Sequence, residues 1–295
     1  MKLIRQFLKF MVPHGLVELR RKALCRNLPP PSAAPNAMPD RSQFHEERKR
    51  VIATVQQRGA AGTQINGMNR DAVVEFLTAR GVPTQHIIEG SIPAASLSFL
   101  HGQMAALVSG SGPLFALHIG NFVGVSLAFL TATCRQRHSD SLVVGIDPNL
   151  PHRGISNPQA HVAALLAACG LQRNALLIAG YSGVKSVSND GVIFEGYDPA
   201  TAFANESACE HTLLNLQKFL PKPFHVAVMD GNHHAAYLVE EIRQLKPLIR
   251  PGGLIVLDDV DAYWSEIKAV FENLPQLGLT VVATDGRVGI AQVSE

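Results

Sequence analysis

The sequence predicts an α/β protein built on a doubly wound, mostly parallel sheet, and three observations lead to this class. From Pro113 onward, short apolar runs alternate with helical stretches. The runs are apolar enough to be buried on both faces, which is typical of parallel strands covered by helices. The C-terminal segment differs, because Asp285-Gly286 separates two strand-like runs in the manner of a hairpin. We therefore expect the last strand to be antiparallel.

The elements follow in a regular order along this part of the chain. Strands are expected at 114–120, 142–147, 175–180, 225–230 and 254–259, and the hairpin at 279–284 and 287–293. Helices are expected between them at 125–135, 158–170 and 235–248. At 295 residues and 46% hydrophobic composition, the chain is long and apolar enough to bury a sizeable core.

The region before the sheet divides into three parts and precedes a core domain at 111–295. Residues 1–26 form a basic amphipathic helix, with seven Lys or Arg against the single acid Glu18. Such a helix packs its apolar face on the main domain or lies on an anionic membrane surface, and the first is the default. Residues 27–40 are a proline-rich linker, and residues 41–110 are predicted to be helical, with a helix over 69–80 that Asn69 caps.

Charge and cysteine usage exclude several classes. A net charge of +2 is too small to indicate nucleic-acid binding. The four cysteines are scattered without CxxC spacing, which disfavours a disulfide framework and fits a reducing compartment. We expect a cytoplasmic protein, with peripheral contact to the inner face of the membrane through residues 1–26 as the alternative.

Ligands of such sheets bind at the carboxyl ends of the strands, near the switch in strand order. The first strand ends in a turn with Gly120 and Gly124, and the second ends in Asp147, an acid of the kind that accepts hydrogen bonds from ribose hydroxyls. The turn reads G-N-F-V-G and lacks the glycine pair that admits a pyrophosphate. It suits a ligand that carries adenosine without phosphates, such as S-adenosylmethionine.

Three stretches carry a family resemblance: ALHIGNFVGVSLAFLTA, VVGIDPN and HVAVMDGNHHAAYLVEEIRQLKPLIRPGGLIVLDDV. Together they resemble class I S-adenosylmethionine-dependent methyltransferases of the small-molecule and sugar O-methyltransferase type with a DGxH motif, over residues 91–292. The resemblance implies a Rossmann-like methyltransferase fold and S-adenosylmethionine as cofactor. The cofactor-binding residues would be His118, Gly120, Asn121, Gly124, Ser126, Asp147, Ser182 and Asp230. His118 stands where the family usually has an acid.

The resemblance also implies a metal site and a base. In the metal-dependent relatives, an Asp after the fourth strand and an acid pair after the fifth hold a divalent cation; here these are Asp230, Asp258 and Asp259. Oxygen ligands suit Mg²⁺, which orients a hydroxyl acceptor and lowers its pKa. His233 stands where such enzymes place their base, so His233 and Asp230 are the candidate catalytic residues. The alternative is a metal-free histidine base, with the acids capping helices and turns.

The expected function is methyl transfer to a hydroxyl of a sugar or small polyol, in bacterial cell-surface glycan or secondary-metabolite biosynthesis. One alternative is a related metal-dependent hydroxylase using His233, His234 and Asp230, although adjacent histidines on a helix diverge. Another is a degenerate methyltransferase that serves as a scaffold.

The expected partners are a small-molecule or glycan acceptor and a second copy of the chain. A long polar segment at 183–210 is expected to cover the site or to form a surface loop, and Trp264 to stack on an acceptor or pack in the core.

Overall fold

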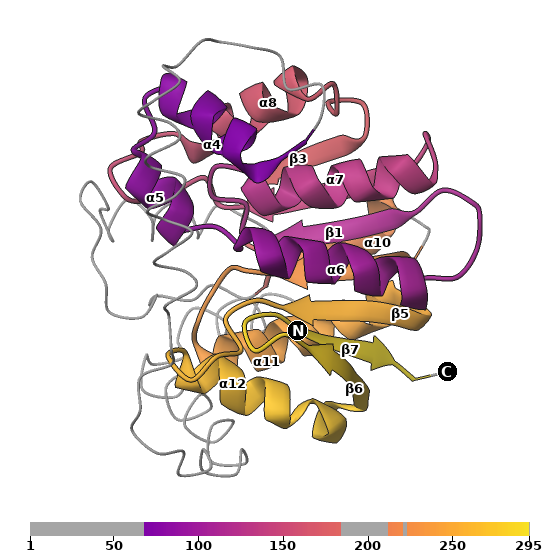
Figure 1. Ribbon diagram of the computed structural model, residues 1–295. Helices are drawn as coiled ribbons and strands as arrows, with labels where there is room; N and C mark the ends of the chain where they lie inside the picture. Colours follow the sequence, from indigo (N-terminus) through magenta and orange to yellow (C-terminus); the bar gives the residue numbers. More distant parts are fainter. Residues whose placement is uncertain (1–67, 184–211, 221–222, 295) are drawn as a thin grey trace, which may run out of the picture.

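A seven-stranded sheet forms the centre of the computed structural model, which describes residues 68–183, 212–220 and 223–294 (Figure 1). The strand order is β3-β2-β1-β4-β5-β7-β6. The strands are β1 (Phe115–Ile119), β2 (Leu142–Asp147), β3 (Ala175–Ala179), β4 (Phe224–Met229), β5 (Ile249–Leu257), β6 (Leu279–Thr284) and β7 (Gly289–Val293). The predicted helix at 1–26, the linker at 27–40, residues 41–67 and most of the 183–210 segment lie outside the described residues.

Strand directions confirm the predicted doubly wound sheet. Strand β1 pairs in parallel with β2 and β4, while β3 and β5 extend the parallel sheet on either side. Strand β7 is antiparallel to both β5 and β6. The turn that reverses the chain holds Gly286 at φ 91°, a conformation that glycine adopts without strain. Strand β5 begins five residues earlier than predicted, because its Pro-Gly-Gly segment continues the strand instead of ending it.

Helices cover both faces of the sheet. They are α4 (Arg70–Ala79), α5 (Thr84–Glu89), α6 (Ala94–Leu107), α7 (Val125–Arg137), α8 (Pro158–Ala168), α10 (Thr212–Phe219), α11 (Ala235–Leu245) and α12 (Ser265–Glu272), with the 3-10 helices η1 (Lys246–Leu248) and η2 (Leu274–Leu277). Asn69 caps α4 as predicted, since its side chain accepts a hydrogen bond from the Ala72 amide. No described helix has the length and apolarity needed to cross a bilayer.

Two apolar clusters hold the layers together. Helices α4, α6, α7 and α8 pack on one face of the sheet, and α10, α11 and α12 pack on the other (Figure 1). Neighbouring residues of β1 serve opposite clusters: Ala116 belongs to the first, and Leu117 and Ile119 to the second. Burial on both faces explains why the strands read as continuous apolar runs.

The switch in strand order falls between β1 and β4, and the chain makes its closest approach there. The Asp230 amide donates to the Ile119 carbonyl at 2.8 Å. A Cβ on Gly120 would lie 2.0 Å from the Asp230 carbonyl oxygen, so no larger residue fits at this position. The fold thereby brings the end of β1 and the start of the DGNHH segment to one edge.

Candidate active site

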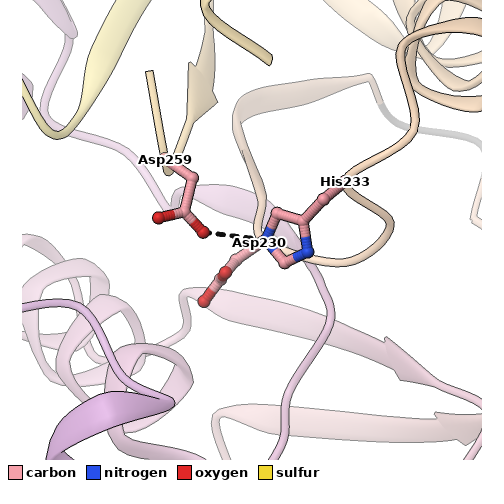
Figure 2. Close-up of side chains that lie close together, drawn as sticks. All are labelled: Asp230, His233 and Asp259. Carbon is pink, nitrogen blue, oxygen red and sulfur yellow. Dashed lines mark hydrogen bonds and ion pairs between the residues drawn. The ribbon is translucent and has the colours of Figure 1, made fainter. Parts of the chain in front are cut away.

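Three side chains with metal-ligating or proton-accepting atoms meet beyond the carboxyl ends of β4 and β5. Ligand atoms of Asp230, His233 and Asp259 all lie within 4.8 Å of one another. Figure 2 shows the Asp259 carboxylate directed at the imidazole of His233, with Asp230 close to both. The Nε2 atom of His233 lies 2.7 Å from Oδ2 of Asp259, whose side chain is only 6% exposed. The group contains both predicted catalytic residues.

Asp259 reaches this group through an unusual backbone conformation. Its φ is 60°, in the left-handed region that residues other than glycine seldom adopt. The two acids of the pair, Asp258 and Asp259, would point to opposite sides if β5 continued regularly. The left-handed turn redirects Asp259, and backbone strain of this kind is concentrated at functional sites.

Arg287, which was not predicted from the sequence, forms a bidentate ion pair with Asp258. Its Nε and Nη2 atoms donate to the two carboxylate oxygens of Asp258, both at 2.8 Å. Its Nη1 atom lies 2.9 Å from Oδ1 of Asp259. The sequence holds one signal for this contact: a hairpin whose second strand pairs with β5 brings the turn beside the acid pair. The structure thus separates Asp258 from the predicted cation-binding trio of aspartates.

Negative charge exceeds positive charge in this group. Three carboxylates face one guanidinium, and His233 adds a positive charge only when protonated. Burial, and after it the charges of Asp258 and Asp259, raise the pKa of Asp230 well above its usual range. Burial is also the main cause that raises the pKa of Asp259, and the charge of Asp258 adds to it. The pKa of Arg287 rises because its acidic neighbours outweigh the effect of burial. A divalent cation or a retained proton would relieve this excess.

The His233 ring is also fixed by α12. The indole of Trp264 stacks on the imidazole, with ring centroids 4.1 Å apart and planes inclined by 16°. Tyr263 contacts the indole edge-on and is itself 48% exposed. His234 is held apart from the group, with Nδ1 3.5 Å from Oε2 of Glu266. Of the two adjacent histidines, only His233 therefore lies in the group with Asp230 and Asp259. Among the described residues, His233, His234 and Asp230 do not come together as the hydroxylase alternative would require.

At the carboxyl ends of β1 and β2, Asp147 organises the predicted cofactor turn. Its Oδ2 atom accepts from the Asn121 amide at 2.7 Å and from the Phe122 amide at 3.2 Å. Its Oδ1 atom accepts from the Asn149 amide at 2.7 Å. A carboxylate offers about four acceptor positions, so one remains for a hydroxyl donor such as a ribose. Burial raises the pKa of Asp147, and the three amide donors oppose that rise.

The turn itself departs from a glycine-rich pattern. Phe122 has φ 45° at a position where no glycine is present. Gly124 has φ 90° and lies against Val162 of α8, where a Cβ would come within 3.2 Å of the valine. The structure thus gives both predicted glycines a packing reason, Gly120 against β4 and Gly124 against α8.

Two other predicted cofactor residues, His118 and Ser126, pair with each other beneath the turn. The Nε2 atom of His118 lies 2.9 Å from the Ser126 hydroxyl, and both side chains are buried. Burial lowers the pKa of His118 to about 4, so its imidazole is neutral at physiological pH. The structure therefore places these residues between β1 and α7, and does not bring their side chains to the edge where ligands bind.

Ser182 is likewise turned inward. Its hydroxyl donates to Oε1 of Glu241, a residue of α11 that is 1% exposed, and lies 3.4 Å from the Tyr237 hydroxyl. Burial raises the pKa of Glu241 to about 8. These contacts fix the chain after β3 onto α11. The structure does not bring Ser182 together with Asp147 or Asp230.

Comparison with known proteins agrees with this architecture. A methyltransferase domain family matches residues 117–260, from β1 to the acid pair. A search of curated proteins found no match.

Solved structures share the fold at low sequence identity. The O-methyltransferase TomG from Streptomyces achromogenes, determined with S-adenosylmethionine, is 16% identical with a TM-score of 0.51, covering 88% of this chain and 100% of its own. An O-methyltransferase from Bacillus cereus is 14% identical with a TM-score of 0.51, covering 84% and 100%. A TDP-rhamnose 3'-O-methyltransferase of calicheamicin biosynthesis is 13% identical with a TM-score of 0.51, covering 88% and 97%.

The sheet order, the antiparallel β7 and the family match agree with one another. The switch point between β1 and β4 lies inside the matched region, as do Asp147 and the group around His233. Residues 117–260 match this methyltransferase domain family, and the chain has the Rossmann-like methyltransferase fold that the S-adenosylmethionine-bound O-methyltransferase TomG also has.

Proposed function

We propose that the protein transfers a methyl group from S-adenosylmethionine to a hydroxyl of a sugar or small polyol. The observation that carries this proposal is the convergence of Asp230, His233 and Asp259 beside the switch point. S-adenosylmethionine supplies a methyl group on a positively charged sulfur. The protein must bring a hydroxyl to that carbon and remove the hydroxyl proton. A group that combines an imidazole with two carboxylates suits that task.

His233 takes the hydroxyl proton in this proposal. Its Nε2 contact with Asp259 and its stacking on Trp264 fix the ring, so that it is oriented before the acceptor arrives. Asp259 stabilises the imidazolium that forms, as a carboxylate partner does in other histidine-based sites. As the proton leaves, the acceptor oxygen attacks the methyl carbon and the carbon–sulfur bond breaks, leaving a neutral thioether.

Asp147 binds the nucleoside end of the cofactor. After its three amide donors, the carboxylate keeps one acceptor position for a ribose hydroxyl, next to the turn that it organises. The position of the reacting carbon then depends on the switch point, where Gly120 allows β1 and β4 to approach closely. This arrangement assigns cofactor binding to the β1–β2 half of this edge and proton removal to the β4–β5 half.

A divalent cation fits the same group. Asp230 accepts no hydrogen bond from any described residue, and the site carries excess negative charge, which are the conditions under which carboxylates hold Mg²⁺ or Mn²⁺. Asp230 and Asp259 would be the oxygen ligands, because a hard cation prefers oxygen and would leave His233 for the proton. The cation would lower the pKa of a bound hydroxyl.

A metal-free reaction is the second candidate, and the contact between His233 and Asp259 favours it. In that case His233 works as a base oriented by a carboxylate alone. Turnover after chelation separates the two. We expect chelation to abolish methyl transfer and Mg²⁺ or Mn²⁺ to restore it, whereas full activity in chelator would leave the histidine as the sole base.

The acceptor class comes from the TDP-rhamnose methyltransferase among the structural neighbours and from the exposed aromatic side chain of Tyr263 beside the site. Aromatic rings stack on flat or apolar ligand faces. The test is a panel of nucleotide sugars, polyols and phenols, with S-adenosylmethionine as donor and mass spectrometry of the products. Methylation of sugars or polyols supports the proposal, while methylation confined to phenols would replace the acceptor class.

A further inference from the structure

Arg287 holds the acid pair from a distant part of the chain. It follows the turn between β6 and β7 and makes three charge-assisted contacts, at 2.8, 2.8 and 2.9 Å, with Asp258 and Asp259. Its carbonyl also accepts from the Val260 amide at 3.0 Å. The guanidinium and the backbone of Arg287 thus both bind the segment that carries the two acids.

The hairpin turn is built to fix Arg287 in place. Oδ1 of Asp285 accepts from the Arg287 amide at 2.9 Å and from the Val288 amide at 2.7 Å. Gly286 supplies the left-handed residue that the turn requires. The backbone position of Arg287 is therefore set by its own turn, independently of the acids that its side chain contacts.

These contacts treat the two acids differently. Both oxygens of Asp258 are occupied by one guanidinium, and its side chain is 1% exposed. Asp259 gives one oxygen to Arg287 and keeps the other toward His233. The guanidinium therefore occupies Asp258 and sets the direction of Asp259.

We propose that Arg287 is a positioning residue that withdraws Asp258 from the cation and aligns Asp259 with His233. This inference rests on the proposed function, and it replaces a site of three aspartates with one of two, Asp230 and Asp259. It has two separable consequences. The guanidinium limits cation affinity because it cancels one negative charge, and it promotes turnover because it orients Asp259.

Cation binding gives a readout that does not depend on methyl transfer. Mn²⁺ bound to the full chain is measured by electron paramagnetic resonance in wild type, Asp230→Asn and Asp258→Asn. We expect Asp230→Asn to abolish binding and Asp258→Asn to weaken it by roughly tenfold at most, because a carboxylate that is not a ligand contributes only its charge. Equal loss in the two variants would make Asp258 a ligand and overturn the inference.

Two substitutions, Arg287→Met and Arg287→Lys, separate the effect of the positive charge from the effect of the bidentate contact with Asp258. Methionine removes the charge, so Mn²⁺ should bind roughly tenfold more tightly or better, as expected when one opposing charge is lost from a half-buried site. Lysine keeps the charge but not the bidentate geometry, so affinity should stay near the wild-type value. In both variants turnover should fall, and unchanged or weaker Mn²⁺ binding by a folded Arg287→Met would contradict the inference.

Failure of the inference and failure of the proposed function give different patterns. If wild type binds no Mn²⁺ while Arg287→Met does, the guanidinium already occupies the place of the cation. The proposed requirement for a metal is then rejected, while the positioning role of Arg287 is retained. If neither protein binds Mn²⁺, both the cation and the inference are rejected, and methyl transfer is still measured independently. Should Arg287→Met fail to fold, the comparison of Asp230→Asn with Asp258→Asn decides alone.

Discussion

The carboxyl-end edge of the sheet has two halves, a first edge at β1 and β2 and a second edge at β4 and β5, and they use their polar residues in opposite ways. At the ends of β1 and β2, the ionisable side chains have hydrogen-bond partners within the fold: Asp147 accepts from three backbone amides, and His118 pairs with Ser126. At the ends of β4 and β5, three carboxylates share one guanidinium, and burial raises the pKa of Asp230 and Asp259. The first edge holds its carboxylate in a network of backbone amides, while the second carries uncompensated charge that a reaction can use.

The largest expected effect separates the adjacent histidines at the second edge. His233→Ala should lower methyl transfer about 10²–10⁴-fold, the usual contribution of a positioned base, without weakening the binding of S-adenosylhomocysteine. His234→Ala is the matched control, because His234 lies against Glu266 and outside the reactive group. Steady-state rates and calorimetry measure the two quantities. Equal losses of turnover in the two variants would remove the distinction between them.

A smaller effect is expected at the first edge. Asp147→Ala should weaken S-adenosylmethionine binding by about 1.5–3 kcal/mol, the range for hydrogen bonds to a charged group. Asp147→Asn keeps the shape but places an amide where the Asn121 and Phe122 amides donate, so it should lose comparable affinity. Calorimetry on folded protein provides the measurement. Unchanged affinity in both variants would show that Asp147 serves the turn and not the cofactor.

The most gradual effect, spread over several pH units, concerns the buried acid Glu241 on α11. Burial raises the pKa of Glu241 from 4.5 in the unfolded chain to about 8 in the folded one. The folded protein then holds a proton that the unfolded chain releases, so the free energy of unfolding falls as pH rises from about 4.5 to 8. The slope reaches at most about 1.4 kcal/mol per pH unit. Glu241→Gln keeps the shape without the titration.

Thermal unfolding of wild type and Glu241→Gln across this pH window tests the prediction. The unfolding midpoint of the wild type should drop more steeply with rising pH than that of the variant, while other titrating groups contribute equally to both. Parallel curves would show that Glu241 does not carry the proton that its burial requires.

The sheet was largely predictable from the sequence because buried parallel strands leave an unambiguous apolar pattern. Strand β2 coincides with its predicted range, 142–147, and the Asp285-Gly286 turn indicated the hairpin. Short helices gave the weakest signal: α5 lies inside the region 41–110 that was predicted to be helical, although its bounds were not predicted, and α10 and α12, with eight residues each, were missed because they are too short for a clear helical period.

The site was predictable in its residue types but not in its pairings. Asp230, His233 and the acid pair follow from their positions after β4 and β5. Which acid faces the histidine depends on the left-handed backbone at Asp259, and no sequence pattern indicates it. The contact with Arg287 spans 29 residues and depends on how β7 pairs with β5.

Inward-facing polar groups are the other feature that the sequence does not reveal. His118 and Ser182 occupy positions where ligand contacts were expected, yet each bonds to a partner inside the fold, Ser126 and Glu241. Glu241 lies in the middle of a helix, where an acid ordinarily faces solvent. Its burial could therefore not be read from the sequence.

Transfer of a deuterated methyl group tests the division between the two edges most directly. Wild type, His233→Ala and Asp147→Ala are incubated with methyl-deuterated S-adenosylmethionine at a saturating and a low concentration, with the acceptor that the panel identifies. Mass spectrometry then counts the labelled product. Saturating cofactor should rescue Asp147→Ala but not His233→Ala, because the first lacks binding and the second lacks chemistry. Rescue of His233→Ala, or failure to rescue Asp147→Ala, would contradict the assignment of binding to β1–β2 and of reaction to β4–β5.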